Sequence, residues 1–391
     1  MRPYLIPYVK AGNGHKAAAM ALREAFDMKK SSSVTVDVLN FSDKVFRILY
    51  SNIYEIIGEH SHKSCGAIYK LTDQKRDKSS LVQLVDKISE KNLTQFREFL
   101  RDNDPPAAIC THFLPQAILA RMKLCGLYKG KVYACITDFD LHLMWLCKGV
   151  DGYFVANKVV KEKLIELGIS SSMIEVTGIP VKSAFQNPDI IKERTSRSAR
   201  MRILVSGSSI TDKKVINLLN LMAKLELPLD IEVITGRNEG LYSKLSDISL
   251  PQPMSLNIHG FIDNMEQLMS RSDIMITKPG GLTLSESLCC DLPTIMFSPI
   301  PYQETNNARF IEVNGAGFLC QEIPCILRRL SFLYHNPDHL SAMRRKCRSL
   351  AFPGAAQMIA DKVMKPLPGN LPEYVLKKKT ELKMEGTGAI R

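Results

Sequence analysis

The segment 274–297, IMITKPGGLTLSESLCCDLPTIMF, contains the pattern that decides the fold. A short apolar run, 274–278, leads into a proline and two glycines. A stretch with helical spacing, 283–290, follows, and then a second apolar run, 294–297. Short apolar runs separated by one helix are typical of the strand–helix–strand unit of a parallel sheet. The segment therefore predicts an α/β protein with helices packed on a mostly parallel sheet.

The same alternation extends across most of the chain. Further strands are predicted at residues 5–6, 34–39, 107–111, 131–137, 152–156, 202–206, 230–235 and 255–259. Helices are predicted at residues 17–26, 81–100, 114–125, 158–167, 213–224, 264–270, 304–314 and 326–350, and the stretch 354–365 is expected to close the fold. Since Pro7 fits poorly inside a central strand, the first strand is expected to end near it.

The predicted domain organisation has two doubly wound, Rossmann-like domains, residues 1–186 and 201–365. The polar segment 187–200, rich in Ser, Lys and Arg, is predicted to link them. Residues 366–391 are rich in Pro, Gly and Lys, and are predicted to form a disordered tail. Ligands of such sheets bind beyond the carboxyl ends of the strands, so we expect the two domains to face each other across a cleft that forms the site.

The charge of the chain indicates which classes of ligand its surface attracts. The chain has 391 residues, and 52 Lys and Arg against 40 Asp and Glu give a formal net charge of +12. A basic surface attracts polyanions, or the excess charge serves only solvation. Because no nucleic-acid-binding motif is present, we favour anionic lipids and phosphorylated ligands over nucleic acid.

Other features of the sequence predict where the protein works. No window approaches the roughly 20 apolar residues of a membrane span, and the first residues lack a signal-peptide pattern. The 10 cysteines have no metal-ligand spacing, so we expect reduced thiols and no zinc site. The prediction is a soluble, cytoplasmic protein.

A glycine–histidine turn follows the first strand, at Gly12-Asn13-Gly14-His15. The glycines permit a tight turn and close backbone approach, and His15 would lie at the start of the next helix. An imidazole with a pKa near 6.5 suits a general base, and a helix N-terminus favours its neutral form. The alternative is an ordinary turn with a capping histidine. A dinucleotide-binding fingerprint is incomplete here, because Gly12-x-Gly14 is followed by Ala17 and no clear ribose-binding acid ends the second strand.

A second glycine turn, Gly280-Gly281, opens a helix directly after a strand. The N–H groups around Leu282 and Thr283 would face a phosphate, helped by the helix dipole. Glu286, about one turn into the helix, is placed to accept bonds from ribose hydroxyls. The alternative is a simple Pro-Gly turn with a helix cap.

The loop after the next strand carries mixed donors and acceptors. Gln303 and Glu304 offer the paired groups that hexose hydroxyls require, and Asn307 lies one turn further on the same helical face. In the first domain, Asp138-Phe139-Asp140 has the acid-x-acid spelling of a manganese site. Because it follows a strand of the opposite domain, we favour Asp138 as a group that orients a base or accepts a proton.

The segment 41–57 carries an apolar, aromatic face with basic edges, formed mainly by Phe46, Leu49, Tyr50, Ile53 and Tyr54. Such a face can lie in a lipid interface. The alternative is a helix packed into the N-terminal core.

These motifs together resemble the monogalactosyldiacylglycerol synthase and processive diacylglycerol glucosyltransferase family. Its members are GT-B enzymes related to the lipid-II-forming N-acetylglucosaminyltransferase. The resemblance rests on motifs in both halves, in the family's order: Gly12-Asn13-Gly14-His15-x-Ala17-Ala18, Thr137-Asp138-x-x-x-His142-x-x-Trp145, His259-Gly260-Phe261-Ile262, Pro279-Gly280-Gly281-x-Thr283-x-x-Glu286 and Pro301-x-Gln303-Glu304-x-x-Asn307-Ala308.

The resemblance implies a UDP-sugar donor and an inverting transfer that needs no metal ion or other cofactor. It assigns the donor as follows: Phe261 and Ile262 to the base, Glu286 to the ribose, Gly280, Gly281, Leu282 and Thr283 to the diphosphate, and Gln303, Glu304 and Asn307 to the sugar. Ser208 lies in a loop that is serine-rich here, where the family has a glycine-rich phosphate loop, which puts part of the phosphate binding in doubt.

On the acceptor side, the resemblance implies His15, helped by Asp138, as catalytic residues, and Gly14, His142 and Trp145 as acceptor-binding residues. The resembled enzymes act on a lipid at a membrane, so segment 41–57 is expected to bind an anionic membrane surface on its cytoplasmic face. The rival functions are N-acetylglucosaminyl transfer to a polyprenyl-linked precursor, UDP-sugar epimerisation, and non-catalytic UDP-sugar binding. The sugar, the acceptor, processivity and the oligomeric state stay open.

Overall fold

The structure is a computed structural model that describes residues 2–10, 13–42, 94–186 and 200–365. The expected tail, almost all of the expected linker, Gly12 and the five aromatic and aliphatic residues of the expected membrane face lie outside these ranges. Within them, no helix combines the length and the apolar character needed to cross a bilayer.

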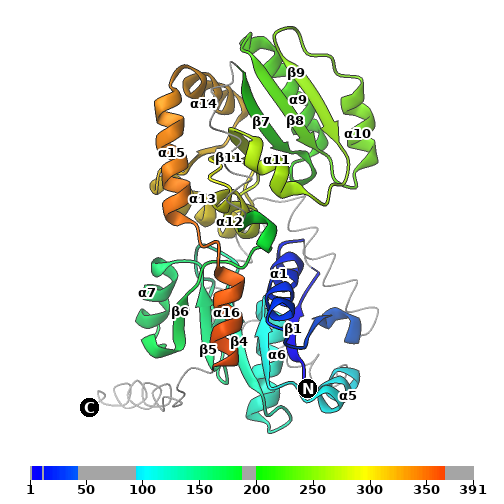
Figure 1. Cartoon of the computed structure of the whole chain (residues 1–391), viewed down its shortest axis with the longest axis vertical. Helices are drawn as coiled ribbons and strands as arrows, with labels where there is room; N and C mark the ends of the chain where they lie inside the picture. Colours follow the sequence, from blue (N-terminus) through cyan, green and yellow to red (C-terminus); the bar gives the residue numbers. More distant parts are fainter. Residues whose placement is uncertain (1, 11–12, 43–93, 187–199, 366–391) are drawn as a thin grey trace, which may run out of the picture.

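The chain forms two α/β domains, one above the other in Figure 1, each built on a six-stranded parallel sheet. The N-terminal sheet has the order β2-β1-β3-β4-β5-β6 and the C-terminal sheet the order β12-β11-β10-β7-β8-β9. The strands are β1 Tyr4–Tyr8, β2 Ser33–Asp37, β3 Ala107–Cys110, β4 Lys131–Cys135, β5 Gly152–Val155, β6 Ile174–Val176, β7 Met201–Ser206, β8 Leu229–Ile234, β9 Ser255–His259, β10 Ile274–Thr277, β11 Thr294–Phe297 and β12 Gly317–Cys320.

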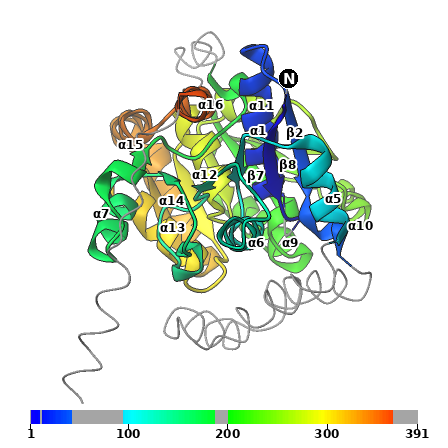
Figure 2. The same ribbon diagram turned by 90° about the horizontal axis from the view of Figure 1, so that it is seen from below.

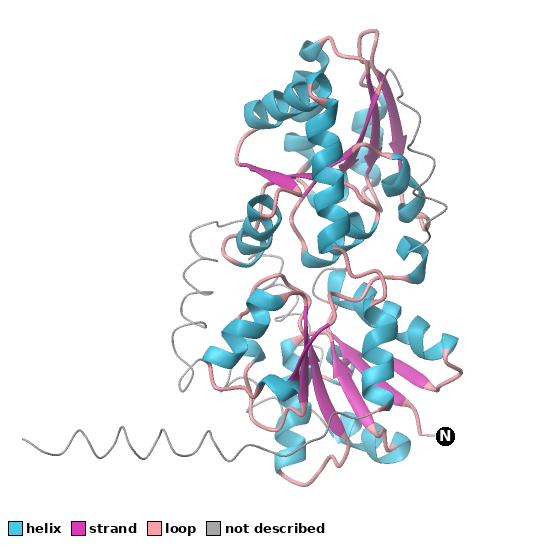
Figure 3. Ribbon diagram, turned by 60° about the vertical axis from the view of Figure 1, so that its left-hand side comes forward, coloured by secondary structure: helices cyan, strands magenta, loops and turns pink. Residues whose placement is uncertain are grey.

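Helices cover the sheets, as Figure 3 shows. The N-terminal domain has α1 Gly14–Met28, α5 Thr94–Asn103, α6 Phe113–Leu124 and α7 Lys158–Glu166. The helices that follow are α9 Asp212–Met222, α10 Glu239–Ser246, α11 Met265–Arg271, α12 Gly281–Cys289, α13 Gln303–Val313, α14 Ile323–His335, α15 Pro337–Leu350 and α16 Ala355–Met364. Short 3-10 helices are η1 Val38–Phe41, η2 Leu143–Trp145, η3 Ser171–Met173, η4 Ser183–Gln186, η5 Gly207–Ser209 and η6 Ala223–Leu225.

The predicted architecture of two doubly wound domains is confirmed. The central strands are buried on both faces, which is why they appear in the sequence as continuous apolar runs. β1 ends one residue after Pro7, close to the predicted end, and the Pro7 carbonyl accepts a hydrogen bond of 3.3 Å from the Thr111 amide.

Several elements differ from the predictions. The predicted helix 326–350 is two helices, because Pro337 has no N–H to continue the first helix and instead begins the second. Strands β6 and β12 and helix α10 were not predicted at all.

Helix α16 returns to the N-terminal domain, although its residues were assigned by sequence to the C-terminal one (Figures 1 and 2). It packs against α1, and its apolar face lies in one buried cluster with the N-terminal sheet. The members of that cluster on α16 are Ala356, Ile359, Ala360 and Val363. The boundary is corrected accordingly: residues 355–364 complete the first domain.

One expectation about the cysteines is also corrected. Cys320, at the end of β12, and Cys325, in the first turn of α14, form a disulfide. The other cysteines of the described ranges are free thiols, and most of them are buried.

Candidate active site between the two domains

His15 lies in the first turn of α1, beside the carboxyl ends of β3 and β4. Its Nδ1 is 2.8 Å from the Thr111 carbonyl oxygen and 3.1 Å from Thr137 Oγ1. Because a carbonyl oxygen only accepts, Nδ1 must carry the proton, and Nε2 is left with a lone pair. This is the tautomer that a general base requires.

The surroundings of His15 also keep it neutral. Burial lowers the pKa of His15, while the charge of Asp138 and the hydrogen bond to Thr111 oppose this shift. His112 meets His15 edge to face, with ring centroids 4.6 Å apart, and its Nδ1 accepts from the Leu114 amide at the start of α6. Burial, together with His15, lowers the pKa of His112 well below its usual range.

Asp138 ties the two domains together. One carboxylate oxygen accepts from Gln303 Nε2 at 2.7 Å, and the other accepts from Asn307 Nδ2 at 2.9 Å. Both partners belong to α13 of the C-terminal domain, so the candidate catalytic carboxylate of Asp138 and a candidate sugar-binding residue are in direct contact. Donor-site and acceptor-side motifs that lie 165 residues apart in the chain meet here.

Asn307, predicted to bind the sugar, is fully buried. Its amide nitrogen donates to Asp138 and to the Pro279 carbonyl, and its amide oxygen accepts from the Phe139 amide. Because these protein bonds occupy both ends of the amide, the geometry favours a role in holding the domains together over one in reading a sugar.

The second acid of the triplet is also bound by protein donors. Asp140 accepts from Lys163 at 2.5 Å and from Asn306 Nδ2 at 2.7 Å. Among the described residues, no cluster of three or more metal-ligating side chains is found.

The start of α12 touches the opposite domain. An added Cβ on Gly281 would lie 2.1 Å from the Thr137 carbonyl oxygen, so only a glycine allows this approach. A Cβ on Gly280 would meet nothing within 4 Å, and one on Gly14 would lie 3.8 Å from Leu282. Gly14 and Leu282 therefore lie at the contact between the two candidate glycine turns, and Thr283 is the next residue of α12.

Glu286 lies further along α12, on a partly buried face. Burial raises its pKa to about 8, with Lys182 opposing the shift and Glu266 adding to it. A protonated carboxyl group can donate as well as accept a hydrogen bond, which suits a pair of ribose hydroxyls.

Glu304 lies in the first turn of α13, where its carboxylate accepts from the Ile300 amide at 2.5 Å and lies 3.7 Å from Lys278 Nζ. Burial raises the pKa of Glu304, and Lys278 opposes this shift. The loop before α13 is strained, since Ser298 and Tyr302 have φ of 58° and 71° without being glycines. Strain of this kind clusters at functional sites.

The predicted base-binding turn follows β9. Phe261 is 59% exposed, and the Arg237 guanidinium lies 5.0 Å from its ring centroid. Ile262 is partly buried and packs against a hydrophobic cluster that contains residues of both domains. Ser208 is exposed in η5, after β7, next to Gly236 of the β8 loop.

Two predicted acceptor-binding residues have other roles in this structure. Trp145 is 2% exposed and packs in the N-terminal core against Phe113, so it is corrected to a core residue. His142 caps η2, where its Nδ1 accepts from the Met144 amide at 3.1 Å.

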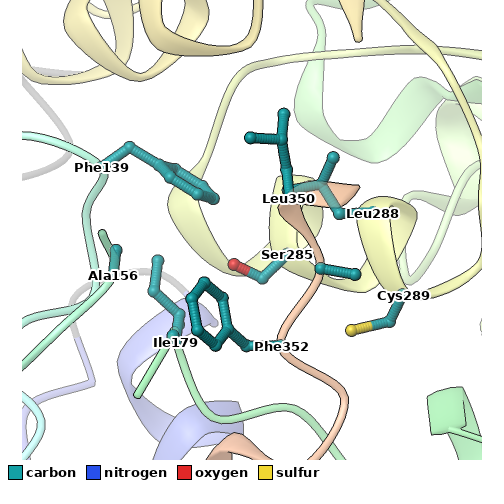
Figure 4. Close-up of a pocket in the computed structure, with 10 residues that line it drawn as sticks. Phe139, Ala156, Ile179, Ser285, Leu288, Cys289, Leu350 and Phe352 are labelled. Carbon is teal, nitrogen blue, oxygen red and sulfur yellow. The ribbon is translucent and has the colours of Figure 1, made fainter. Parts of the chain in front are cut away.

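An apolar seam joins the domains beside these polar contacts. Phe139 stacks on Phe310 with ring centroids 5.0 Å apart. Phe352, of the segment that leads to α16, is among the residues that line a small pocket at this seam (Figure 4). Gly178 permits the close approach of Phe352, because a Cβ at Gly178 would lie 2.2 Å from that side chain.

Sequence reasoning missed the supports of His15, namely Thr111, Thr137 and His112. A signal was available: Thr111 and Thr137 end predicted strands and His112 directly follows one, and ligands of a parallel sheet collect at these carboxyl ends.

Known proteins resemble this chain in sequence and in fold. A family model for monogalactosyldiacylglycerol (MGDG) synthase matches residues 15–181, and one for the glycosyltransferase family 28 C-terminal domain matches residues 203–378. MurG of Acinetobacter baumannii aligns over 93% of this chain and 100% of its own, with a TM-score of 0.64 at 18% identity. The UDP-GlcNAc 2-epimerase of Neisseria meningitidis aligns with a TM-score of 0.56 at 15% identity, over 94% of this chain and 100% of its own.

Two facing Rossmann-like domains with this architecture define a GT-B protein, and the matched domains make it a glycosyltransferase. The processive diacylglycerol β-glucosyltransferase of Bacillus cytotoxicus is 30% identical over 365 residues, which cover 90% of this chain and 91% of that protein. The corresponding protein of Bacillus thuringiensis is 29% identical over 364 residues, with the same coverage. The chain belongs to the monogalactosyldiacylglycerol synthase and processive diacylglycerol glucosyltransferase family.

Proposed function

We propose that this protein transfers a hexose from a UDP-sugar to the hydroxyl of diacylglycerol at an anionic membrane surface, with inversion and without a metal ion. The observation that carries the proposal is the meeting of His15, Asp138 and Gln303 at the facing edges of the two sheets. The names of the relatives support diacylglycerol as the acceptor.

In the proposed reaction, Nε2 of His15 takes the proton of the acceptor hydroxyl. The hydroxyl oxygen bonds to the anomeric carbon, and the bond from that carbon to the diphosphate breaks. UDP leaves with the electron pair. Attack opposite the leaving group yields a β-glycolipid. Asp138 stabilises the protonated imidazole, since its charge raises the pKa of His15.

The donor would lie along the carboxyl edge of the C-terminal sheet. Phe261 and Ile262 would contact the base, and Glu286 the ribose. The N–H groups at the start of α12, with Ser208, would contact the diphosphate, and Gln303 and Glu304 the sugar. A donor that enters must replace the bond between Gln303 and Asp138, which frees both side chains for substrate.

The test uses labelled UDP-glucose, UDP-galactose and UDP-N-acetylglucosamine with anionic vesicles that contain diacylglycerol, with and without EDTA. We expect a β-linked hexose in the extracted lipid, at the same rate in EDTA. A His15→Ala variant should lose at least about 100-fold in turnover while it keeps its affinity for UDP. Label that stays water-soluble as an epimer, or full activity of the variant, would contradict the proposal.

A further inference from the structure

Lys214 connects two loops of the candidate donor site. It lies in the first turn of α9, just after β7, and its ammonium donates a hydrogen bond to Ser298 Oγ, just after β11. The same ammonium is 5.3 Å from the centroid of the Phe297 ring, which fixes its position further.

The order of the strands in the sheet shows which strand the contact between Lys214 and Ser298 crosses. β10 lies between β7 and β11, so a side chain that reaches from the end of β7 to the end of β11 crosses the carboxyl end of β10. β10 leads directly into the turn Pro279-Gly280-Gly281 and the N-terminus of α12. The contact between Lys214 and Ser298 therefore joins the segments on both sides of β10, the strand that leads into the turn whose N–H groups are candidates for binding phosphate.

Among the residues that the structure describes, no carboxylate balances the charge of Lys214. Within the described ranges no Asp or Glu lies at ion-pair distance from it, whereas neighbouring Lys278 is 3.7 Å from Glu304. The loop after β7 is serine-rich and has no cation of its own in η5. A diphosphate that departs without a metal ion gains charge, and a preorganised cation stabilises it.

We propose that Lys214, held by Ser298, binds the diphosphate of the nucleotide donor and stabilises the departing nucleoside diphosphate. This inference rests on the proposed function, because it assigns one more residue to the donor site. It also explains how a loop without the family's glycines binds this group.

The test compares UDP with uridine, by calorimetry and by ligand-observed NMR. Lys214→Met should weaken UDP binding about 10- to 100-fold, as expected for loss of a charge-assisted hydrogen bond, and leave uridine binding unchanged. Ser298→Ala should give a smaller loss, and Lys214→Arg should restore most of the affinity. The matched control is Lys213→Met, which removes the same charge from the exposed neighbouring position and should change UDP affinity less than about twofold.

Three results would overturn the inference. Equal UDP affinity of the wild type and Lys214→Met would remove Lys214 from the diphosphate site. Loss of uridine and UDP binding together would show a structural role instead. An equal loss in Lys213→Met would show only an effect of net charge. A wild-type protein that binds no UDP at all would contradict the proposed function itself.

Discussion

The imidazole of His15 is surrounded by groups that act on its protonation in opposite directions. Burial favours the neutral form, and Asp138 favours the charged one. We expect kcat/KM to fall on the acid side only below pH 6.5, the ordinary His pKa, because the pKa of His15 is lowered and the base must be neutral to act. Asp138→Asn removes the opposing charge and should move this acid limb to still lower pH.

The matched control for this pH profile is Asp140→Asn, since Asp140 pairs with Lys163 and Asn306 and is not among the groups that shift the pKa of His15. Its acid limb should coincide with that of the wild type. The measurement is kcat/KM between pH 5 and 8 for the wild type and both variants. An acid limb of Asp138→Asn that moves to higher pH would argue against His15 as the base.

Glu286 makes the stability of the protein depend on pH. Its pKa is about 8 in the folded protein against an ordinary value of 4.5, so folding takes up a proton between these values and stability falls as pH rises through that window. Glu286→Gln cannot ionise. We therefore expect the difference in melting temperature, variant minus wild type, to be larger at pH 8 than at pH 5. Thermal unfolding of both proteins at the two pH values measures it. An equal difference at the two pH values would contradict the shift.

At this scale, sequence reasoning located His15 and Gly281 from their glycine turns, and the structure places both beside the opposite strand ends or domain. It missed roles that depend on packing. Asn307 and Trp145 belong to recognisable motifs, but only the fold reveals that both side chains are buried. The support of His15 by His112 joins two strand ends about 100 residues apart, a contact that no local pattern encodes.

Among the elements, α12 approaches the N-terminal domain closely at Gly281. Gly281→Ala places a Cβ against the Thr137 carbonyl oxygen and should cost about 1–3 kcal/mol of unfolding free energy. It should also move the domains apart, seen as a larger radius of gyration in small-angle scattering. Gly280→Ala is the matched control, because its Cβ meets open space, and it should cost less than about 1 kcal/mol. Equal behaviour of the two variants would show that this contact does not set the domain distance.

Most elements could be predicted because buried parallel strands are continuous apolar runs. The missed ones are those with weak patterns. β6 has only three residues, and β12 begins with a glycine. The division between α14 and α15 has a clear signal in Pro337, and the rule that proline ends a helix would have located it.

For the whole molecule, the packing of α16 on the N-terminal domain makes the stability of that domain depend on a helix at the end of the described chain. Ile359 is fully buried between α16 and the N-terminal domain, so Ile359→Ala should lower the unfolding free energy by about 2–5 kcal/mol. Met358 on the same helix is 40% exposed, and Met358→Ala should change it by less than about 0.5 kcal/mol. Urea unfolding measures both, and a matching small effect would mean that α16 contributes little to the first domain.

Residues 355–364 thus belong in space to the half of the protein from which they are most distant in sequence. A chimera that exchanges donor specificity between relatives must therefore keep residues 355–364 with the N-terminal domain on which they pack. A graft that takes everything after residue 200 would import a foreign helix onto the face formed by α1 and β1, and mismatched packing there would be mistaken for failed catalysis. The transplantable unit is residues 200–350, inserted between a first domain and its own final helix.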